Sequence, residues 1–371
     1  MAKSGGGNPK FGGREMELIP DLPDEIAADC LVRVPYISHC KLKSVCRRWR
    51  CLVNNPWFYQ QRKATRTSEE CIFMLQALPH QEGEPCANKA KPYKGAPDYG
   101  ITAYNPVGGA CHTLPPIPQF PTSIPLFSRC VSVRGKLIVI GGWHPSTMRA
   151  VNCLFCYDVL NGRWVRGADM PTLRSFFACC VSDQGVVYIA GGHDEEKNAV
   201  NMVEAYDVEK DAWEIVPPMS KARDECGAFF MDGKLVVISG YETQAQGRFL
   251  SSGEVFNLQT RSWSWVENMW KIGRCPRSCV AFGCRLYSFC NGGVVRYNEK
   301  ENVWIEEGSM PQGITVTACA TMAEGKIFVS ACDSSKVMCC YIFETENGKW
   351  VEMERAEGFG GLVQCATTLE L

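Results

Sequence analysis

The sequence has almost no net charge and contains no long apolar run. In 371 residues, 39 Lys and Arg face 40 Asp and Glu, and the charges are scattered. A binding footprint for nucleic acid or for a membrane surface is therefore not expected. No apolar run reaches the length of about 18 residues that a membrane span needs, and the first residues lack the pattern of a signal peptide. We expect residence in the cytoplasm or nucleus.

Histidine is scarce, and the familiar catalytic motifs are absent. The sequence has no HxH or HExxH spacing, no Gly-x-Ser-x-Gly elbow and no phosphate-binding glycine loop. We therefore expect no catalytic residues and no cofactor. The five histidines are dispersed: His39, His80, His112, His144 and His193.

Cysteine is abundant, with 22 residues. Without a secretion signal, reduced thiols are expected, and most of them lie in apolar strand-like runs where Cys acts as a small hydrophobic residue. Zinc sites need paired ligands at matched spacings. Cys153 and Cys156 form one close pair, but no second pair accompanies it. No metal site is predicted.

An aromatic residue followed seven positions later by Trp recurs along the chain, and the Trp residues are 41 to 50 positions apart. Small-residue pairs such as Gly141-Gly142 and Gly191-Gly192 precede most of them. This period and the paired glycines are typical of a kelch β-propeller, in which each repeat forms a four-stranded blade. The aromatic and Trp side chains are interpreted as packing between blades. Five complete pairs and one degenerate pair occur: Tyr157/Trp164, Tyr206/Trp213, Phe256/Trp263, Tyr297/Trp304, Phe343/Trp350 and Tyr104/Cys111.

The two ends of the repeat region complement each other. Residues 363–369 resemble the first strand of a blade without the other three, whereas residues 72–77, 101–105 and 111–114 resemble the other three strands without the first. An open ring would expose unpaired strand edges. We therefore predict an all-β propeller of six blades, in which the last strand completes the first blade.

Loop lengths distinguish the two faces of this ring. The turns between first and second strands, and between third and fourth strands, are tight, whereas long connections such as 78–98, 143–152 and 241–252 lie on the opposite face. Arginine and exposed aromatic residues are typical of protein-binding hot spots. Arg174 and Arg223 recur at equivalent positions, so they either brace the blades or contact a substrate. The candidate substrate-binding residues on the long-loop face are Trp143, His144, Arg149, Arg174, His193, Arg223, Tyr241, Arg248, Phe249, Trp270, Arg274 and Arg277.

The N-terminal part has a different pattern. Residues 1–15 are rich in glycine and are expected to be disordered. Apolar residues then follow at helical spacing over 22–34, 38–53 and 57–63, with Pro23 in a first turn and Ser38 as a candidate cap. The predicted domains are a small helical domain at 16–64 and a propeller at 65–371.

Three segments of the helical domain carry a recognisable pattern. They are Leu18–Ile26 (LIPDLPDEI), Leu31–Pro35 (LVRVP) and Val45–Arg50 (VCRRWR). In this order they resemble the F-box, which docks on the Skp adaptor of cullin-based ubiquitin ligases. The residues expected to contact the adaptor, some of which must also form the domain's own core, are Leu22, Pro23, Ile26, Leu31, Pro35, Leu42, Val45, Cys46 and Trp49.

An F-box followed by a kelch propeller resembles the plant F-box/kelch-repeat family. The resemblance implies a non-catalytic substrate receptor that binds the Skp adaptor, reaches cullin and RING subunits through it, and presents a protein substrate for ubiquitination and degradation. Glu17–Pro20 and Arg62-Lys63 resemble a subgroup that targets phenylalanine ammonia-lyase, and a neighbouring subgroup targets chalcone synthase. The resemblance therefore implies a role in phenylpropanoid metabolism.

Three other interpretations remain open. A kelch scaffold could bind proteins without ubiquitin transfer. A copper oxidase of the kelch type would need converging His and Tyr ligands, for which His144, His193 and Tyr241 are the available set. A ligand-gated receptor would need a chromophore site in an added domain, for which residues 64–71 leave no room. Separately, a small molecule in the central channel could assist substrate binding.

Overall fold

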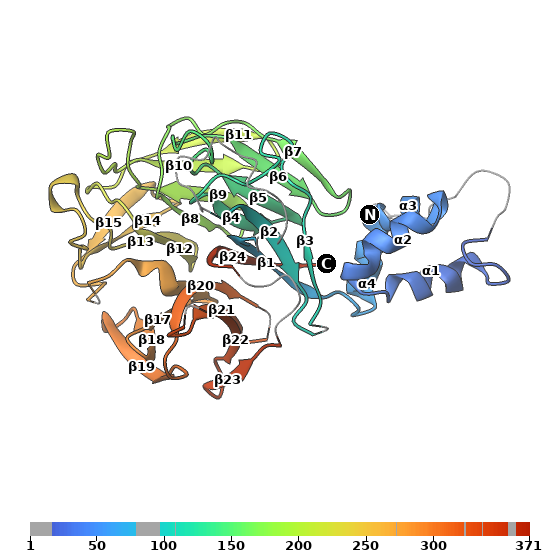
Figure 1. Cartoon of the computed structure of the whole chain (residues 1–371). Helices are drawn as coiled ribbons and strands as arrows, with labels where there is room; N and C mark the ends of the chain where they lie inside the picture. Colours follow the sequence, from blue (N-terminus) through green and yellow to red (C-terminus); the bar gives the residue numbers. More distant parts are fainter. Residues whose placement is uncertain are drawn as a thin grey trace, which may run out of the picture. The chain divides into compact units, whose positions relative to one another are not determined.

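The computed structural model describes residues 17–78, 97–107, 109–271, 273–322, 324–335, 337–354 and 361–371. The chain divides into two compact units, residues 1–68 and residues 69–371. Figure 1 draws the first as helices and the second as strands. The predicted disordered segment 1–15 and most of the predicted loop 78–98 lie outside the described residues.

The first unit is helical. Leu18, Leu31, Leu52 and Phe58 lie in its core, each at most 5% exposed. Within the described residues, no helix is long and apolar enough to cross a membrane. The elements are α1 (Asp24–Val32), the 3-10 helix η1 (Tyr36–Ser38), α2 (His39–Val45), α3 (Arg47–Val53) and α4 (Pro56–Ala64).

The prediction of one continuous helix over residues 38–53 is wrong. Cys46 has extended backbone angles, φ −156° and ψ 168°, and separates α2 from α3. Its sulfur accepts the backbone N–H of Trp49 at 3.4 Å, so Cys46 caps α3. Ser38 ends η1 and makes no side-chain cap for α2, whereas the Asn55 side chain caps α4 by accepting the N–H of Trp57 at 2.9 Å.

The second unit is a propeller of six four-stranded antiparallel sheets, as predicted (Figure 1). The first strand in each group below is the innermost. The blades are β24 (Val363–Glu370), β1 (Glu70–Ala77), β2 (Tyr99–Tyr104) and β3 (Cys111–Thr113); β4 (Arg129–Val133), β5 (Lys136–Ile140), β6 (Leu154–Asp158) and β7 (Arg163–Arg166); β8 (Ala178–Val181), β9 (Val186–Ala190), β10 (Val203–Asp207) and β11 (Ala212–Val216); β12 (Gly227–Met231), β13 (Lys234–Ile238), β14 (Gly253–Asn257) and β15 (Ser262–Val266); β16 (Cys279–Phe282), β17 (Arg285–Cys290), β18 (Gly293–Asn298) and β19 (Val303–Ser309); β20 (Thr315–Thr321), β21 (Lys326–Cys332), β22 (Met338–Glu344) and β23 (Lys349–Glu352).

The ring closes through its last strand, as the sequence predicted. β24 pairs with β1 in antiparallel register from Glu70↔Glu370 to Gln76↔Val363. The ladder continues one step further, since Glu69 and Leu371 exchange two backbone hydrogen bonds of 2.8 and 2.9 Å. The innermost strands contact one another in the closed order β24, β4, β8, β12, β16, β20 and back to β24. Closure removes the free strand edges that an open ring would expose.

Apolar cores fill the spaces between neighbouring blades. In one of them, Ile138 and Leu154 pack against Val187 and Tyr206 of the next blade, all at most 1% exposed. The repeated Trp contributes directly, since Trp213 lies opposite Tyr206 with ring centroids 5.0 Å apart and donates its Nε1–H to the carbonyl of Ala168 at 2.9 Å. Ala168 belongs to the preceding blade. The same donation occurs from Trp164 to Pro115, Trp263 to Pro217, Trp304 to Met269 and Trp350 to Ser309.

The packing interpretation of the Trp repeat is therefore confirmed. The spacing of seven follows from the geometry of a hairpin, because it places the aromatic residue of the third strand directly opposite the Trp of the fourth. Each indole N–H bond to the preceding blade contributes roughly 1 kcal/mol in addition to the burial of the ring.

Candidate functional site

Residues from two kinds of connection meet on the long-loop face of the propeller. Ser175, in the link between two blades, forms a two-way backbone bridge with His193, in the loop after β9, and Asp224 bridges Tyr241 in the same way. The paired glycines permit this approach. Gly192 has φ +90°, and a Cβ there would lie 2.4 Å from the carbonyl oxygen of Ser175. The links and the long loops therefore lie on one face, as predicted.

A line of polar side chains connects these bridges. The Oγ of Ser175 is 2.8 Å from Nε2 of His193, and Nδ1 of His193 is 2.8 Å from Oδ2 of Asp224. This is the hydrogen-bond order of a hydrolase triad. However, Ser175 is only 2% exposed, and a nucleophile must reach the carbonyl carbon that it attacks. We interpret the line as a connection between blades.

Aromatic rings form a cluster beside this line. The ring centroid of Phe127 lies 5.4 Å from that of Trp143 and 4.8 Å from that of Phe176. The Phe176 ring stacks on His193 with centroids 5.3 Å apart. Phe127 keeps 37% of its surface exposed. A pocket of about 160 Å³ opens beside the cluster and is lined by Trp143, Phe176, His193, Lys197, Asp224, Glu225, Tyr241, Thr243 and Gln246. We call the cluster and this pocket the aromatic pocket.

The aromatic pocket combines apolar walls with charged groups. Burial and then the negative charge of Asp224 raise the pKa of Tyr241, so its hydroxyl stays protonated and bonds to Asp224. Glu225 pairs with Arg277 at 3.2 Å. Trp143, Phe176 and Tyr241 thus provide aromatic surface next to charged groups such as Lys197 and Glu225, a combination that suits contact with a protein segment.

Sequence reasoning named Trp143, His193 and Tyr241 of this pocket but missed Phe127 and Phe176. Both missed residues have positive φ, 60° and 56°, and lie two positions before the first residue of an innermost strand. They are separated by 49 residues, the same interval as Trp164 and Trp213. Aligning the repeats on Trp would have revealed the repetition, although not that the rings meet.

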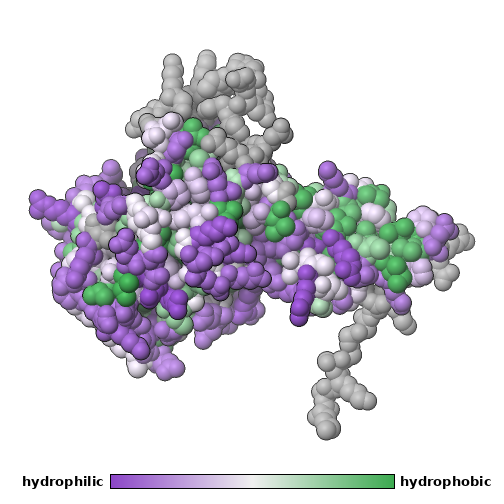
Figure 2. All heavy atoms as spheres, turned by 90° about the horizontal axis from the view of Figure 1, so that it is seen from below, coloured by the Kyte–Doolittle hydropathy of each residue, from purple (hydrophilic) through white to green (hydrophobic). Residues whose placement is uncertain are grey.

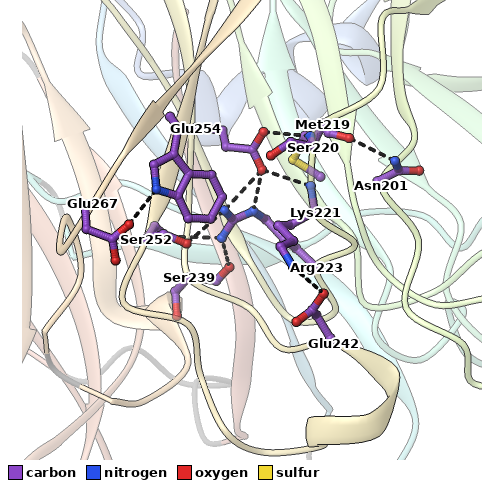
Figure 3. A network of polar contacts seen from close by, with 11 residues as sticks. Asn201, Met219, Ser220, Lys221, Arg223, Ser239, Glu242, Ser252, Glu254 and Glu267 are labelled. Atoms are coloured by element: carbon purple, nitrogen blue, oxygen red, sulfur yellow. Dashed lines mark hydrogen bonds and ion pairs between the residues drawn. The ribbon is translucent and has the colours of Figure 1, made fainter.

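Arg174 and Arg223 brace the blades, which is one of the two alternatives that the sequence left open, and they are too buried to contact a substrate. Each guanidinium is 0% exposed and pairs with a buried glutamate, Arg174 with Glu204 at 2.9 Å and Arg223 with Glu254 at 3.1 Å. Figure 3 shows the second pair. Arg223 also donates to the carbonyls of Ser239 and Ser252, at 2.7 and 3.1 Å.

The remaining predicted residues differ in exposure. Trp270 is 1% exposed and donates its indole N–H to the carbonyl of Arg274 at 2.8 Å, so it supports a link and the prediction of direct substrate contact is wrong for it. The other side chains reach the surface to different extents. Arg149, Arg248, Arg274 and Arg277 are exposed, whereas Trp143, His144 and Phe249 are half-buried.

The three residues that a copper site would require do not share one hydrogen-bonded setting. His144 packs against Phe120 and accepts the N–H of Ser146 at 3.2 Å, whereas both ring nitrogens of His193 face Ser175 and Asp224. Within the described part of the chain, no group of three or more His, Cys, Asp or Glu could hold a metal ion.

The predicted adaptor-binding residues of the helical unit fall into two sets according to their exposure to solvent. Leu31 and Leu42 are 3% and 8% exposed, so they are core residues and not surface contacts. Ile26 and Val45 are 52% and 60% exposed, which is unusual for such large apolar side chains. Pro23, Pro35 and Cys46 are also exposed, and Leu22 and Trp49 are half-buried. Figure 2 shows hydrophobic side chains gathered on the surface of this unit.

Residues of the F-box-like segments Leu18–Ile26 and Val45–Arg50 contact one another in the helical unit. The backbone N–H of Leu18, and then the Arg48 guanidinium, lower the pKa of Asp24, and Arg48 pairs with Asp24 at 2.7 Å. Trp49 donates its indole N–H to the carbonyl of Leu18 at 2.6 Å. The LIPDLPDEI and CRRWR segments therefore pack together, and this arrangement leaves Ile26 and Val45 on the surface.

Comparison with known proteins supports both units. Residues 19–61 match the F-box domain, and residues 127–305 match the KLHDC2/KLHL20/DRC7 Kelch-repeats domain. From Arabidopsis thaliana, the F-box/kelch-repeat protein SKIP20 is 34% identical, with 95% of this chain and 96% of that protein covered. The chain belongs to the F-box/kelch-repeat family. A second relative, the F-box/kelch-repeat protein At1g80440 of the same plant, is 35% identical over 96% of this chain and all of its own length.

The family assignment gives each surface of this F-box/kelch-repeat protein a general role. An F-box implies binding to a Skp adaptor, and a kelch propeller implies binding to a protein substrate. Together they support the role of a substrate adaptor in Skp-cullin-F-box ubiquitin ligases.

Proposed function

We propose that this chain binds the Skp adaptor through the exposed apolar side chains of α1 and α2, with Ile26 and Val45 as the central contacts. The observation that carries the proposal is the exposure of these two side chains, the only large aliphatic ones that are more than half exposed among the described residues of a unit whose core contains Leu18, Leu31, Leu42 and Leu52. While both side chains are in water, the favourable free energy of burying their apolar surface is not gained, and contact with a partner would provide it. The adaptor then connects the chain to the cullin and RING subunits.

The test is co-purification of the full chain with a plant Skp adaptor. An Ile26→Asp/Val45→Asp variant is expected to weaken binding at least about thirtyfold, because two central apolar contacts are lost and two charges are desolvated. Val165→Asp/Ile215→Asp is the matched control, since these side chains are 49% and 65% exposed on propeller strands β7 and β11. Equal loss in both variants, or retained binding in the first, would contradict the proposal.

We propose that the substrate is bound at the aromatic pocket. Its apolar walls would bury one or two side chains of the substrate, while Lys197 and Glu225 and the exposed arginines Arg149, Arg248, Arg274 and Arg277 would contact the flanking polar segment. Proximity of the bound substrate to the ubiquitin-charged enzyme would then accelerate transfer, so the chain itself has no chemical step to perform.

A Phe127→Ala/Phe176→Ala variant is expected to lose substrate capture while keeping the adaptor. Ile215→Ala on the outer strand β11 is the control and should retain both. If the pocket variant captures the same ubiquitinated proteins as the unmodified chain, the aromatic pocket is not the substrate site.

The candidate substrates are phenylalanine ammonia-lyase and chalcone synthase. The support is the resemblance of Glu17–Pro20 and Arg62-Lys63 to the subgroup that targets phenylalanine ammonia-lyase, beside which a neighbouring subgroup targets chalcone synthase. In the structure Arg62 is buried and donates to the carbonyls of Val32 and Val34 at 2.7 and 2.6 Å, so that part of the resemblance reflects the folding of the helical unit. Failure to capture either enzyme from plant extract, with adaptor binding intact, would reject both candidates.

We also propose that the chain is non-catalytic and acts in the cytoplasm or nucleus. The burial of Ser175 supports the first statement, and the 22 cysteines of the sequence, most of them in apolar strands, suit a reducing compartment. An esterase activity abolished by Ser175→Ala, or a fluorescent fusion found only in the secretory pathway, would contradict these proposals.

A further inference from the structure

The central channel of the propeller is unusually rich in thiols. The innermost strands of the six blades line it, and its wall includes Arg129 and Gln364. Six cysteines contribute to the same wall: Cys130, Cys179, Cys226, Cys279, Cys319 and Cys365. Adaptor and substrate binding, as proposed above, use none of them.

Two of these cysteines lie against each other across the closure of the ring. Cys130 belongs to β4 and Cys365 to β24, and both line the channel. The Cys365 sulfur lies 3.9 Å from the carbonyl oxygen of Ser128, two residues before Cys130, and each thiol is the largest influence on the pKa of the other. The neighbouring side chains fix the register of the two strands, since the N–H of Ser132 donates to Oγ1 of Thr367 at 3.1 Å and the two hydroxyls lie 2.9 Å apart. The thiols are therefore held together by the packing of two innermost strands.

The surroundings distinguish Cys365 from the other channel thiols. The Cys130 thiol and then the positive charge of Arg129 lower the pKa of Cys365. The Arg129 side chain is held in place because its Nε donates to the carbonyl of Phe177 at 3.0 Å. Burial instead raises the pKa of Cys179 to about 12 and also raises that of Cys319. A thiolate beside a cation is the reactive form of cysteine.

We propose that Cys130 and Cys365 form a redox-sensitive pair that hydroperoxides convert to a disulfide, thereby locking the strand that closes the ring. The Cys365 thiolate attacks one oxygen of hydrogen peroxide, so that an S–O bond forms, the O–O bond breaks and the released hydroxide takes up a proton. Cys130 then attacks the sulfur of the sulfenic acid while its proton goes to the departing oxygen, so that an S–S bond forms and water leaves. Two thiols and one peroxide yield one disulfide and two waters.

The consequence would be a covalent bond between two neighbouring blades, made by residues that are far apart in the sequence. β24 is held to β1 by backbone hydrogen bonds, whereas its contact with β4 is made by side chains. A disulfide between Cys130 and Cys365 would keep these two residues together in the unfolded chain. It would thereby lower the entropy of the unfolded chain and favour the closed ring.

The test treats the folded, reduced full chain with hydrogen peroxide and maps the cysteines by mass spectrometry. The expected result is loss of the mass of two hydrogen atoms in a peptide pair containing Cys130 and Cys365, together with an upward shift in melting temperature that dithiothreitol reverses. Cys130→Ser should stop the reaction at a sulfenic acid on Cys365, which dimedone traps. Oxidation of exposed Cys30 or Cys284 without any Cys130–Cys365 link in the unmodified chain would overturn the proposal.

Cys319→Ser is the matched control, because Cys319 lies in another innermost strand and lines the same channel. It should form the Cys130–Cys365 link at the rate of the unmodified chain. Linkage of Cys365 to Cys319 or Cys179 in preference to Cys130 would also overturn the assignment. Each variant is compared only after its circular dichroism spectrum matches that of the unmodified chain.

Discussion

The two units of the chain bury arginine in different ways. The propeller pairs Arg174 and Arg223 with buried glutamates, whereas in the helical unit the buried Arg62 donates to the backbone carbonyls of Val32 and Val34. The propeller contains inter-blade cores and paired internal charges, so its stability comes from its own sequence. The helical unit is small, and a short chain buries a smaller share of its surface. We therefore expect the propeller to fold without a partner, and the helical unit to gain stability when it binds one.

The largest expected effect comes from breaking a buried ion pair in the propeller. Glu254→Ala leaves the buried Arg223 guanidinium without its counterion, which should lower the free energy of unfolding by about 3–5 kcal/mol. Glu242→Ala is the control, because its ion pair with Lys221 is exposed and should contribute at most about 1 kcal/mol. Denaturant titration measures both. Equal effects would mean that burial does not distinguish the two pairs.

A core substitution in the helical unit tests the independence of the units. Leu52 is 0% exposed, so Leu52→Ala should destabilise the helical unit by about 2–4 kcal/mol. Hydrogen exchange should then accelerate in α1 to α4 and stay unchanged in the propeller. Ile26→Ala, at an exposed position on α1, should change neither. If propeller exchange also accelerates in the Leu52 variant, the two units unfold together.

The helical unit should also be the more sensitive of the two to acid. Burial, and then the positive charge of Arg62, lower the pKa of His39 to about 3 from its ordinary value of 6.5. Below pH 6.5 the unfolded chain therefore binds a proton that the folded unit does not. Stability is present above pH 6.5 and falls by about 1.4 kcal/mol per pH unit between that value and pH 3. Exchange of α1 to α4 at pH 7 and pH 5, corrected for intrinsic rates, measures this fall.

The His39→Gln variant serves as the comparison for the acid effect. Because this variant lacks the titrating imidazole, its helices should not show the loss of hydrogen-exchange protection between pH 7 and pH 5 that His39 causes in the unmodified chain. An identical dependence on pH in both proteins would assign the effect to another group.

The smallest effect is expected for one of the repeated indoles. Trp213→Phe keeps an aromatic ring opposite Tyr206 but removes the N–H bond to Ala168. We expect a loss of about 1–2 kcal/mol in the propeller, measured by thermal melting, and no change in the helical unit. Trp265→Phe is the control, because its indole is 45% exposed and donates only to Glu267 among the described contacts. A larger loss in the control would contradict the bracing role of Trp213.

Repetition made most of the fold predictable. The interval of seven places an aromatic residue opposite a Trp in each such hairpin, as in Tyr206 and Trp213. The blades could therefore be counted from the sequence. The isolated strand at residues 363–369 could be matched with an incomplete blade because strand edges must be paired. The F-box segments were visible because their residue types resemble the motif in its order. In the structure Asp24 pairs with Arg48, and both Asp24 and Trp49 are hydrogen-bonded to the backbone of Leu18.

The missed features depend on contacts between distant residues. Nothing in the local sequence shows that Glu204 and Glu254 are buried, so Arg174 and Arg223 could not be distinguished from surface residues. Cys46 is an uncommon helix cap, so the break between α2 and α3 gave no usual signal. Phe127 and Phe176 meet only because neighbouring blades bring their links together. The aromatic pocket therefore could not be predicted as a pocket, although three of its residues were named.

The pairing of β24 with β1 has a consequence for how the protein is made. β3 ends at Thr113 and β24 begins at Val363, so the ribosome adds about 250 residues between the outermost strand of the first blade and its innermost one. The helical unit, by contrast, is complete by residue 68. Because translation proceeds at about 5–20 residues per second, the helical unit is available to an adaptor well before the propeller can close. Assembly with the ligase can thus precede the ability to hold a substrate.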